Sequence, residues 1–209
     1  MRDRVLVRID CQYDFVDPEG ALTINNPDFI YQHQRFCENL QKGMFSRIID
    51  AADTHFVETY QNTREAEDYP LHTVYYSWGW QKIADFKDNI PVTDIYKSTT
   101  NLWNEEKTYG ILQQDWRLKD VYLCGLLSDV CVRQAMDGFL RRGAKVVLLE
   151  DLCRGAQKQM PEIVAEAQYA NALAGGRLQM ITSKQFFRQV LNEKKRFFNF
   201  VNKNSGEAR

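Results

Sequence analysis

The sequence has almost no net charge and no long apolar run. Its 27 basic and 28 acidic residues leave a formal charge of −1, so a nucleic-acid-binding surface is not expected. A membrane-spanning helix needs about 18 consecutive apolar residues, and the chain has no such stretch. The first residues contain no signal-peptide core. These absences predict a cytoplasmic protein that acts on a small molecule, with neither nucleic acid nor a membrane as a partner.

Two common cysteine and glycine motifs are also missing. The five cysteines form no C-x-x-C pair, and with no export signal they are expected to be reduced thiols. No G-x-G-x-x-G follows the first apolar stretch, so a dinucleotide site is not expected. One of the thiols could serve as a nucleophile, although their number does not say which.

The 209 residues contain no internal repeat and no linker-like segment, which predicts one domain over residues 1–209. The tail from about residue 192 combines Lys194-Lys195-Arg196 with a Phe-Phe-x-Phe cluster. We interpret this tail as peripheral, an amphipathic terminal helix that docks its phenylalanines and then frays.

Short apolar runs alternate with amphipathic stretches, which is typical of βαβ units and predicts an α/β protein. The expected strands are Val5–Asp10, Arg47–Asp53, Asp94–Tyr96, Val121–Gly125, Lys145–Glu150 and Leu178–Thr182. The expected helices are Asp129–Arg142, stopped by Gly143, and Pro161–Leu173. The connection over residues 53–80 is long, which makes it a candidate functional loop.

Three reactive side chains follow expected strands. Asp10 ends the first strand, Lys97 follows the third, and Cys131 follows the fourth at the start of a helix. Since ligands bind beyond the carboxyl ends of parallel strands, these side chains are expected at one rim. Taken singly, Asp10 also fits a helix cap, Lys97 a solvated surface lysine and Cys131 a small buried thiol.

Cys131 has features of a nucleophile. The positive end of a helix dipole favours a thiolate, and an ammonium such as that of Lys97 lowers a thiol pKa further. Backbone N–H groups of the same turn could stabilise an oxyanion. From the pattern alone, a nucleophile and a buried structural cysteine remain evenly matched.

A second group of residues could hold a metal ion. Asp53, His55, Glu65 and His72 supply two imidazoles and two carboxylates within one segment, and such ligands suit Zn, Fe or Mn. The alternative is a solvated loop that contains one or two packed histidines. The remaining histidine, His33, is expected to be structural.

Four segments match the sequence pattern of a known family: Asp10–Phe15 (DCQYDF), Gly20–Leu22 (GAL), Cys124–Val132 (CGLLSDVCV) and Val147–Asp151 (VLLED). In these segments the chain resembles the isochorismatase-like cysteine hydrolases, and within them the nicotinamidases. The resemblance implies a three-layer α/β/α fold with a six-stranded, parallel, doubly wound sheet. It also implies a homo-oligomer that cleaves a small aromatic amide such as nicotinamide to the acid and ammonia.

The resemblance assigns roles to the three rim residues. Cys131 is expected to form a thioester with the substrate, Asp10 to transfer protons, and Lys97 to hold both in place. A cis peptide is expected at Leu126–Leu127, and the oxyanion is expected to bind the backbone N–H groups of Leu127 and Cys131.

The resemblance also assigns the metal and the substrate ring. Asp53, His55, Glu65 and His72 would hold one divalent ion, with zinc favoured over iron or manganese, and the ion would bind the pyridine nitrogen. Phe15 is expected to flank the ring. Trp103 and Tyr60 are further candidates for that role, although an aromatic side chain more often packs in the core.

Some positions depart from the family pattern. Tyr13 replaces an asparagine, Thr73 replaces a cysteine, a Gly-Thr pair is lost within residues 74–80, and Arg8 lies in the apolar first strand. Two alternatives therefore remain. One is a metal-independent relative that acts on another small amide or a vinyl ether, and the other is a catalytically idle binding module of the same fold.

Overall fold

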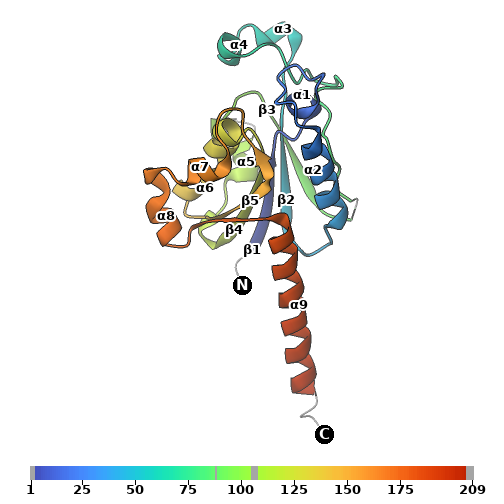
Figure 1. Cartoon of the computed structure of the whole chain (residues 1–209), viewed down its shortest axis with the longest axis vertical. Helices are drawn as coiled ribbons and strands as arrows, with labels where there is room; N and C mark the ends of the chain where they lie inside the picture. The colour runs from blue at the N-terminus through green and yellow to red at the C-terminus, as the bar shows by residue number, and fades with distance from the viewer. Residues whose placement is uncertain (1–2, 88, 105–107, 206–209) are drawn as a thin grey trace.

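Six strands form one sheet at the centre of this computed structural model, which describes residues 3–87, 89–104 and 108–205 (Figure 1). Every neighbouring pair is parallel, in the order β3-β2-β1-β4-β5-β6. The chain builds outward from β1 on one side and then from β4 on the other, so the sheet is doubly wound, as predicted. The strands are β1 (Asp3–Ile9), β2 (Arg47–Asp53), β3 (Val92–Lys97), β4 (Lys119–Leu126), β5 (Lys145–Arg154) and β6 (Leu178–Ile181).

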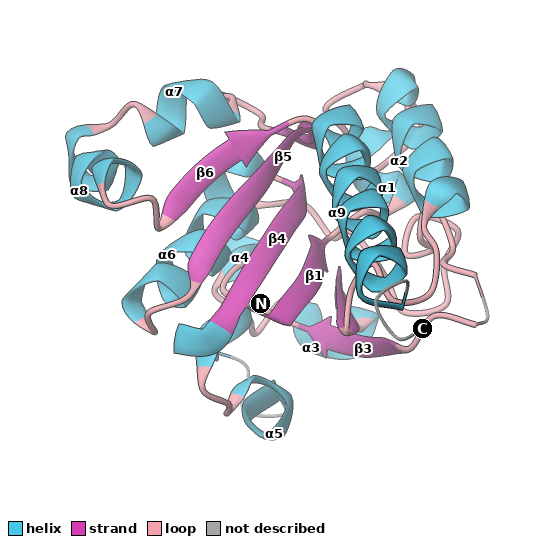
Figure 2. Ribbon diagram, turned by 90° about the horizontal axis from the view of Figure 1, so that it is seen from below, coloured by secondary structure: helices cyan, strands magenta, loops and turns pink. Residues whose placement is uncertain are grey.

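Helices cover both faces of the sheet, which completes the three layers (Figure 2). On one face α2 lies beside α9, with the Phe36 and Phe187 ring centroids 5.6 Å apart. On the other face α6 packs Phe139 against Trp116, at 4.8 Å between centroids. The helices are α1 (Tyr13–Val16), α2 (Pro27–Asn39), α3 (Val57–Tyr60), α4 (Glu65–Asp68), α5 (Tyr109–Leu112), α6 (Arg133–Arg141), α7 (Met160–Val164), α8 (Ala170–Ala174) and α9 (Ser183–Ser205).

Two expected helices differ from the prediction. The helix expected over Asp129–Arg142 begins as a π-helical turn at Ser128–Val132 and continues as α6. The helix expected over Pro161–Leu173 is broken into α7, a 3₁₀ turn and α8, because Glu166 is extended at φ −63° and ψ 141°. In that position the Glu166 carboxylate pairs with Arg133 and Lys158, contacts that lie outside the local helical period.

The C-terminal tail is one long helix, and its docking differs from the prediction. The first turns of α9 pack on the sheet, where Phe186 and Val190 are buried. Farther along, Phe198 is 65% exposed, and the helix projects away from the sheet (Figure 1). The side chains of Phe197 and Phe200 lie outside the described part of the structure. Despite the length of α9, no described helix has both the length and the apolar character to cross a membrane.

Arg8, the charged residue in the first strand, is paired within the sheet. The register places Arg8 of β1 beside Asp50 of β2, and the guanidinium donates two hydrogen bonds of 2.7 Å to the Asp50 carboxylate. Lys82 also reaches Asp50, at 2.7 Å, and Arg8 donates to the backbone carbonyl of Ala84. Both Arg8 and Asp50 are buried, and each charge compensates the other. Either charge alone in the core would strongly destabilise the fold.

Asp50→Ala is expected to lower the free energy of unfolding by about 3–5 kcal/mol, because it leaves the Arg8 guanidinium buried without its carboxylate. Urea denaturation measures the loss. As a control, Glu38→Ala removes one partner of the exposed Arg35–Glu38 pair and should change stability by less than about 1 kcal/mol. Equal stabilities for the two variants would show that the buried pair does not hold the sheet.

Candidate active site and metal centre

The three reactive residues meet at the carboxyl edge of the sheet. They lie near β1 and β4, the adjacent central strands from which the two halves of the sheet extend in opposite directions. Asp10 follows β1, Lys97 is the last residue of β3, and Cys131 lies in the π-helical turn after β4. The Lys97 Nζ is 2.8 Å from the Asp10 Oδ2 and 4.0 Å from the Cys131 Sγ. The structure therefore brings together the rim residues that the sequence predicts.

Burial decides the protonation of the thiol. It raises the pKa of Cys131 well above its usual value, and the nearby Lys97 ammonium lowers it only in part. The expectation of a ready thiolate at the helix start is therefore corrected, because desolvation outweighs the positive neighbour. A thiol with a raised pKa would need a base to remove its proton before it could act as a nucleophile.

Asp10 has the protonation behaviour of such a base. Burial raises the pKa of Asp10 to about 7, against the opposing effect of Lys97. Burial lowers the pKa of Lys97, but the carboxylates of Asp10 and Asp53 outweigh it and raise the pKa well above its usual value. The lysine therefore stays charged while the carboxyl group can gain or lose a proton near neutral pH.

A small cavity of about 20 Å³ opens onto these groups, lined by Asp10, Phe15, Asp53, Glu65, His72, Leu127 and Cys131 among others. That volume holds about one water molecule, so the lining side chains lie close around the centre of the cavity. Phe15, which is expected to flank the substrate ring, lines this cavity. The Leu126–Leu127 peptide is cis, as the resemblance implies, and Leu127 and Cys131 both border the cavity.

Two predicted substrate contacts do not line this cavity. Trp103 packs in the core with its ring centroid 4.8 Å from that of Phe139, and its indole N–H donates to the Ala135 carbonyl. Tyr60 is buried behind the histidines, where its hydroxyl donates to backbone carbonyls of Tyr69 and Pro70. Both follow the ordinary behaviour of aromatic side chains and bury their rings.

Four cavity residues escaped the sequence reasoning: Leu22, Tyr69, Thr100 and Val130. Two of them carried a signal. Tyr69 stands directly before Pro70 in the segment that leads to His72, and Leu22 ends the Gly-Ala-Leu motif. Val130 directly precedes Cys131 and Thr100 follows Lys97 by three residues, but neither residue type indicated that its side chain would line the cavity.

The predicted metal ligands also converge. Asp53 ends β2, His55 follows two residues later, Glu65 begins α4, and His72 lies in the loop beyond it. One ligand atom from each of the four lies within 4.8 Å of the others, and all four residues are buried. The His55 Nε2 is 2.9 Å from both the Asp53 Oδ2 and the Glu65 Oε2, and the His72 Nε2 is 3.0 Å from the same Asp53 oxygen.

The arrangement fits a divalent metal ion. The His55 Nε2 and the Glu65 Oε2 are buried and, among the described residues, have no partner with hydrogen-bond geometry despite their short separation. Tetrahedral ligands about 2.0–2.1 Å from zinc lie roughly 3.3 Å apart, close to the separations observed. The His72 Nδ1 is 2.7 Å from the Pro70 carbonyl, which favours a proton there and leaves Nε2 free to bind a metal.

The two carboxylates beside His55 favour its protonated form. Burial lowers the pKa of His55, but the nearby carboxylates of Asp53 and Glu65 outweigh it and raise the pKa to about 9. Burial raises the pKa of Asp53, whereas Lys97 and the two histidines hold it well below its usual value. Metal binding would therefore displace a proton from the imidazole, as expected for such a ligand set.

The candidate metal ligands and the Cys131 thiol are joined through one lysine. Lys97 donates a hydrogen bond of 3.2 Å to the Asp53 Oδ1 while it contacts Asp10 and Cys131. Gln12, another residue that the sequence reasoning missed, bonds to both the backbone N–H and the backbone carbonyl of Asp53 at 2.8 Å. The loop after β1 thus fixes Asp10 directly and the metal ligand Asp53 through Gln12.

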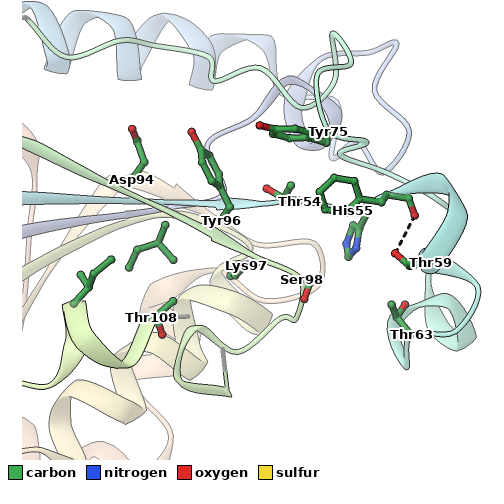
Figure 3. A pocket seen from close by; sticks show the side chains of 13 residues that line it. Thr54, His55, Thr59, Thr63, Tyr75, Asp94, Tyr96, Lys97, Ser98 and Thr108 are labelled. Atoms are coloured by element: carbon green, nitrogen blue, oxygen red, sulfur yellow. Dashed lines mark hydrogen bonds between the residues drawn. The ribbon is translucent and has the colours of Figure 1, made fainter. Parts of the chain in front are cut away.

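A wider cavity of about 570 Å³ lies beside β3 and is lined by hydroxyl side chains together with Tyr75 and Tyr96 (Figure 3). It reaches Lys97 and His55, but Asp10 and Cys131 do not line it. The hydroxyls of Thr59 and Thr63 are already bonded to the backbone carbonyls of Phe56 and Tyr60. We therefore place the chemistry in the smaller cavity.

Known proteins match the chain over most of its length. A model of the isochorismatase domain family matches residues 4–174. Nicotinamidase from Saccharomyces cerevisiae is 22% identical over 200 residues, which cover 77% of this chain and 92% of that protein.

Two solved structures show the same fold. Pyrazinamidase from Pyrococcus horikoshii, in complex with zinc, has a TM-score of 0.66 at 22% identity and covers 86% of this chain and 99% of its own. PnC1 from L. infantum, in complex with nicotinate, has a TM-score of 0.65 at 23% identity and covers 88% of this chain and 94% of its own.

His72→Ala is expected to weaken zinc binding by at least about tenfold, because it removes one of four converging ligands. The affinity is measured by titration of chelator-treated protein in competition with a chromophoric chelator. His33→Gln is the matched control, since His33 is buried elsewhere and has its Nε2 3.2 Å from the Leu152 carbonyl. Unchanged affinity in His72→Ala would remove this residue from the metal centre.

Proposed function

The chain belongs to the isochorismatase domain family, and we propose that it hydrolyses the carboxamide of nicotinamide or of a similar small aromatic amide, which releases ammonia and the acid. The observation that carries the proposal is the arrangement around Lys97. This residue contacts the Asp10–Cys131 pair on one side and the ligand Asp53 on the other. A nucleophile beside a metal centre suits a substrate with a reactive carbonyl at one end and a metal-binding atom at the other.

The relatives support the same substrate class. The yeast protein is a nicotinamidase, and the two solved structures are a pyrazinamidase in complex with zinc and a protein in complex with nicotinate. The ligand cluster of Asp53, His55, Glu65 and His72 argues against a metal-independent relative. The buried contacts among the three rim residues argue against an idle binding module.

In the first half of the proposed reaction, the Cys131 Sγ attacks the amide carbonyl carbon. Its proton passes to Asp10, whose pKa of about 7 allows it to act as a base near neutral pH. The carbonyl oxygen becomes an oxyanion that accepts hydrogen bonds from the backbone N–H groups of Leu127 and Cys131. Asp10 then donates the proton to the amide nitrogen, the C–N bond breaks, and ammonia leaves a thioester on Cys131.

In the second half, Asp10 accepts a proton from water, which attacks the thioester carbonyl. The C–S bond breaks, the acid leaves, and the Cys131 thiol regains its proton from Asp10. Lys97 remains charged throughout and holds the Asp10 carboxylate in place.

The substrate ring is held at the end of the site that contains the four candidate metal ligands. Asp53, His55, Glu65 and His72 would hold a divalent ion, which when bound supplies a Lewis acid that takes the ring nitrogen as a ligand. Zinc is favoured, and the ligand set also suits iron or manganese. Phe15 lines the same cavity, and its ring centroid is 5.5 Å from that of His72, so it can pack against the substrate ring.

Cys131→Ala is expected to lower the rate of ammonia release from nicotinamide by at least about 1,000-fold, because no other thiol among the described residues lines the small cavity. The assay is run on metal-loaded protein. Cys153→Ala is the matched control, since Cys153 is a buried thiol in β5 that does not line the cavity, and this variant should keep its activity.

The same assay separates the alternatives. Removal of the metal with a chelator should lower the wild-type rate, and added zinc, iron or manganese should restore it. Full activity in the chelated protein would favour a metal-independent hydrolase. Turnover by Cys131→Ala would show that the nucleophile is another group.

A further inference from the structure

Thr73, the residue after His72, contacts Asp53, a proposed metal ligand that lies 20 positions earlier in the chain. It is fully buried, and its hydroxyl donates a 2.8 Å hydrogen bond to the Asp53 Oδ2. That oxygen is the one that lies 2.9 Å from the His55 Nε2 and 3.0 Å from the His72 Nε2. The hydroxyl therefore acts on the carboxylate oxygen that faces the two imidazoles.

The rest of the Asp53 side chain and backbone is held by other groups. Lys97 donates to its Oδ1 at 3.2 Å, and the Gln12 amide bonds to its backbone on both sides. An aspartate carboxylate that is held at only one oxygen can still rotate about χ2, because the angles that this torsion adopts are broadly distributed. The Thr73 hydroxyl opposes that rotation, because it holds Oδ2 toward the histidines.

Thr73 is itself held in an unusual backbone conformation. Its φ of +43° lies in the left-handed region, which a β-branched residue seldom adopts. The Thr73 N–H donates a 2.6 Å hydrogen bond to the Asp14 Oδ2, and the other Asp14 oxygen accepts from the N–H of Ala21. A conformation of this kind persists only where the surroundings impose it, and such positions cluster at functional sites.

Gly79 closes the other side of Asp14. A Cβ at Gly79 would lie 2.0 Å from the Asp14 Oδ1, so only glycine leaves room for this carboxylate. Gly79 also accepts a 3.0 Å hydrogen bond from the Asp14 N–H. Asp14, Thr73 and Asp53 thus form one buried chain of contacts that ends at the metal ligand.

We propose that Thr73 is a positioning residue for the metal centre, because its hydroxyl orients the Asp53 carboxylate toward His55 and His72 while Asp14 holds the Thr73 backbone. Thr73 is not itself a ligand. The inference rests on the metal centre of the proposed function and adds a residue at which this chain departs from the pattern of its family. Groups that orient metal ligands in this way typically contribute about 10- to 100-fold to metal affinity.

Thr73→Val tests the proposal, since it keeps the shape of the side chain and removes the hydroxyl. The expected result is a 10- to 100-fold weaker affinity for zinc, measured without substrate by competition with a chromophoric chelator. Thr73→Ser keeps the hydroxyl and should bind zinc as the wild type does. The visible absorption spectrum of the cobalt-loaded protein should change in Thr73→Val and not in Thr73→Ser, because it reports the ligand geometry.

Two further variants separate positioning from general damage to the fold. Thr73→Gly also removes the hydroxyl but accepts the positive φ, so it should lose zinc affinity without loss of thermal stability in the metal-free protein. Thr54→Val removes a neighbouring buried hydroxyl, which donates to the Ala52 carbonyl, and should keep the wild-type affinity.

Wild-type affinity in Thr73→Val or in Thr73→Gly would overturn the proposal, and so would an equal loss in Thr54→Val or in Thr73→Ser. These results would leave the metal centre and the amide hydrolysis standing. Absence of zinc binding by the wild type would instead overturn the metal centre, and the proposal with it.

Discussion

The site depends on one buried ammonium group. The Lys97 side chain is 1% exposed and lies between the carboxylates of Asp10 and Asp53. Two buried carboxylates in one place repel each other and lose their hydration, so a cation between them is needed if either is to ionise. Lys97 meets that need from the middle of the site, and its own pKa rises because both acids favour the charged form.

This arrangement follows from the strand order. Because β1 pairs with β2 and β2 with β3, the residues at their carboxyl ends are neighbours along one edge. The register places Asp53 of β2 directly beside Lys97 of β3. The crossover to β4 then adds Cys131 from the other half of the sheet. The candidate metal centre and Cys131 therefore lie at one edge, and a substrate that contacted both would have to fit the separation that the sheet sets.

The sequence predicts the residues at this edge well, because strand ends and motif spacing are local signals. The structure brings Asp10, Lys97 and Cys131 together, and it also brings together the four candidate metal ligands that the sequence singles out. The parallel sheet is also predicted, since apolar runs mark its buried strands, and its doubly wound order is what the family resemblance implies.

Properties that depend on the packed surroundings could not be predicted. The protonated state of the Cys131 thiol follows from burial, which a helix-dipole argument does not include. Trp103 could not be assigned to the core, because nothing local shows that it meets Phe139. The contact of Thr73 with Asp53 joins residues 20 positions apart across a turn with positive φ. The break at Glu166 likewise follows from a partner, Arg133, on another helix.

The thioester proposed at Cys131 can be trapped by acid quench of metal-loaded protein during turnover of nicotinamide, followed by digestion and mass spectrometry. We expect a nicotinoyl group on the peptide that contains Cys131. A nicotinoyl group on another of the five cysteines, or unmodified protein while nicotinate forms, would contradict this expectation.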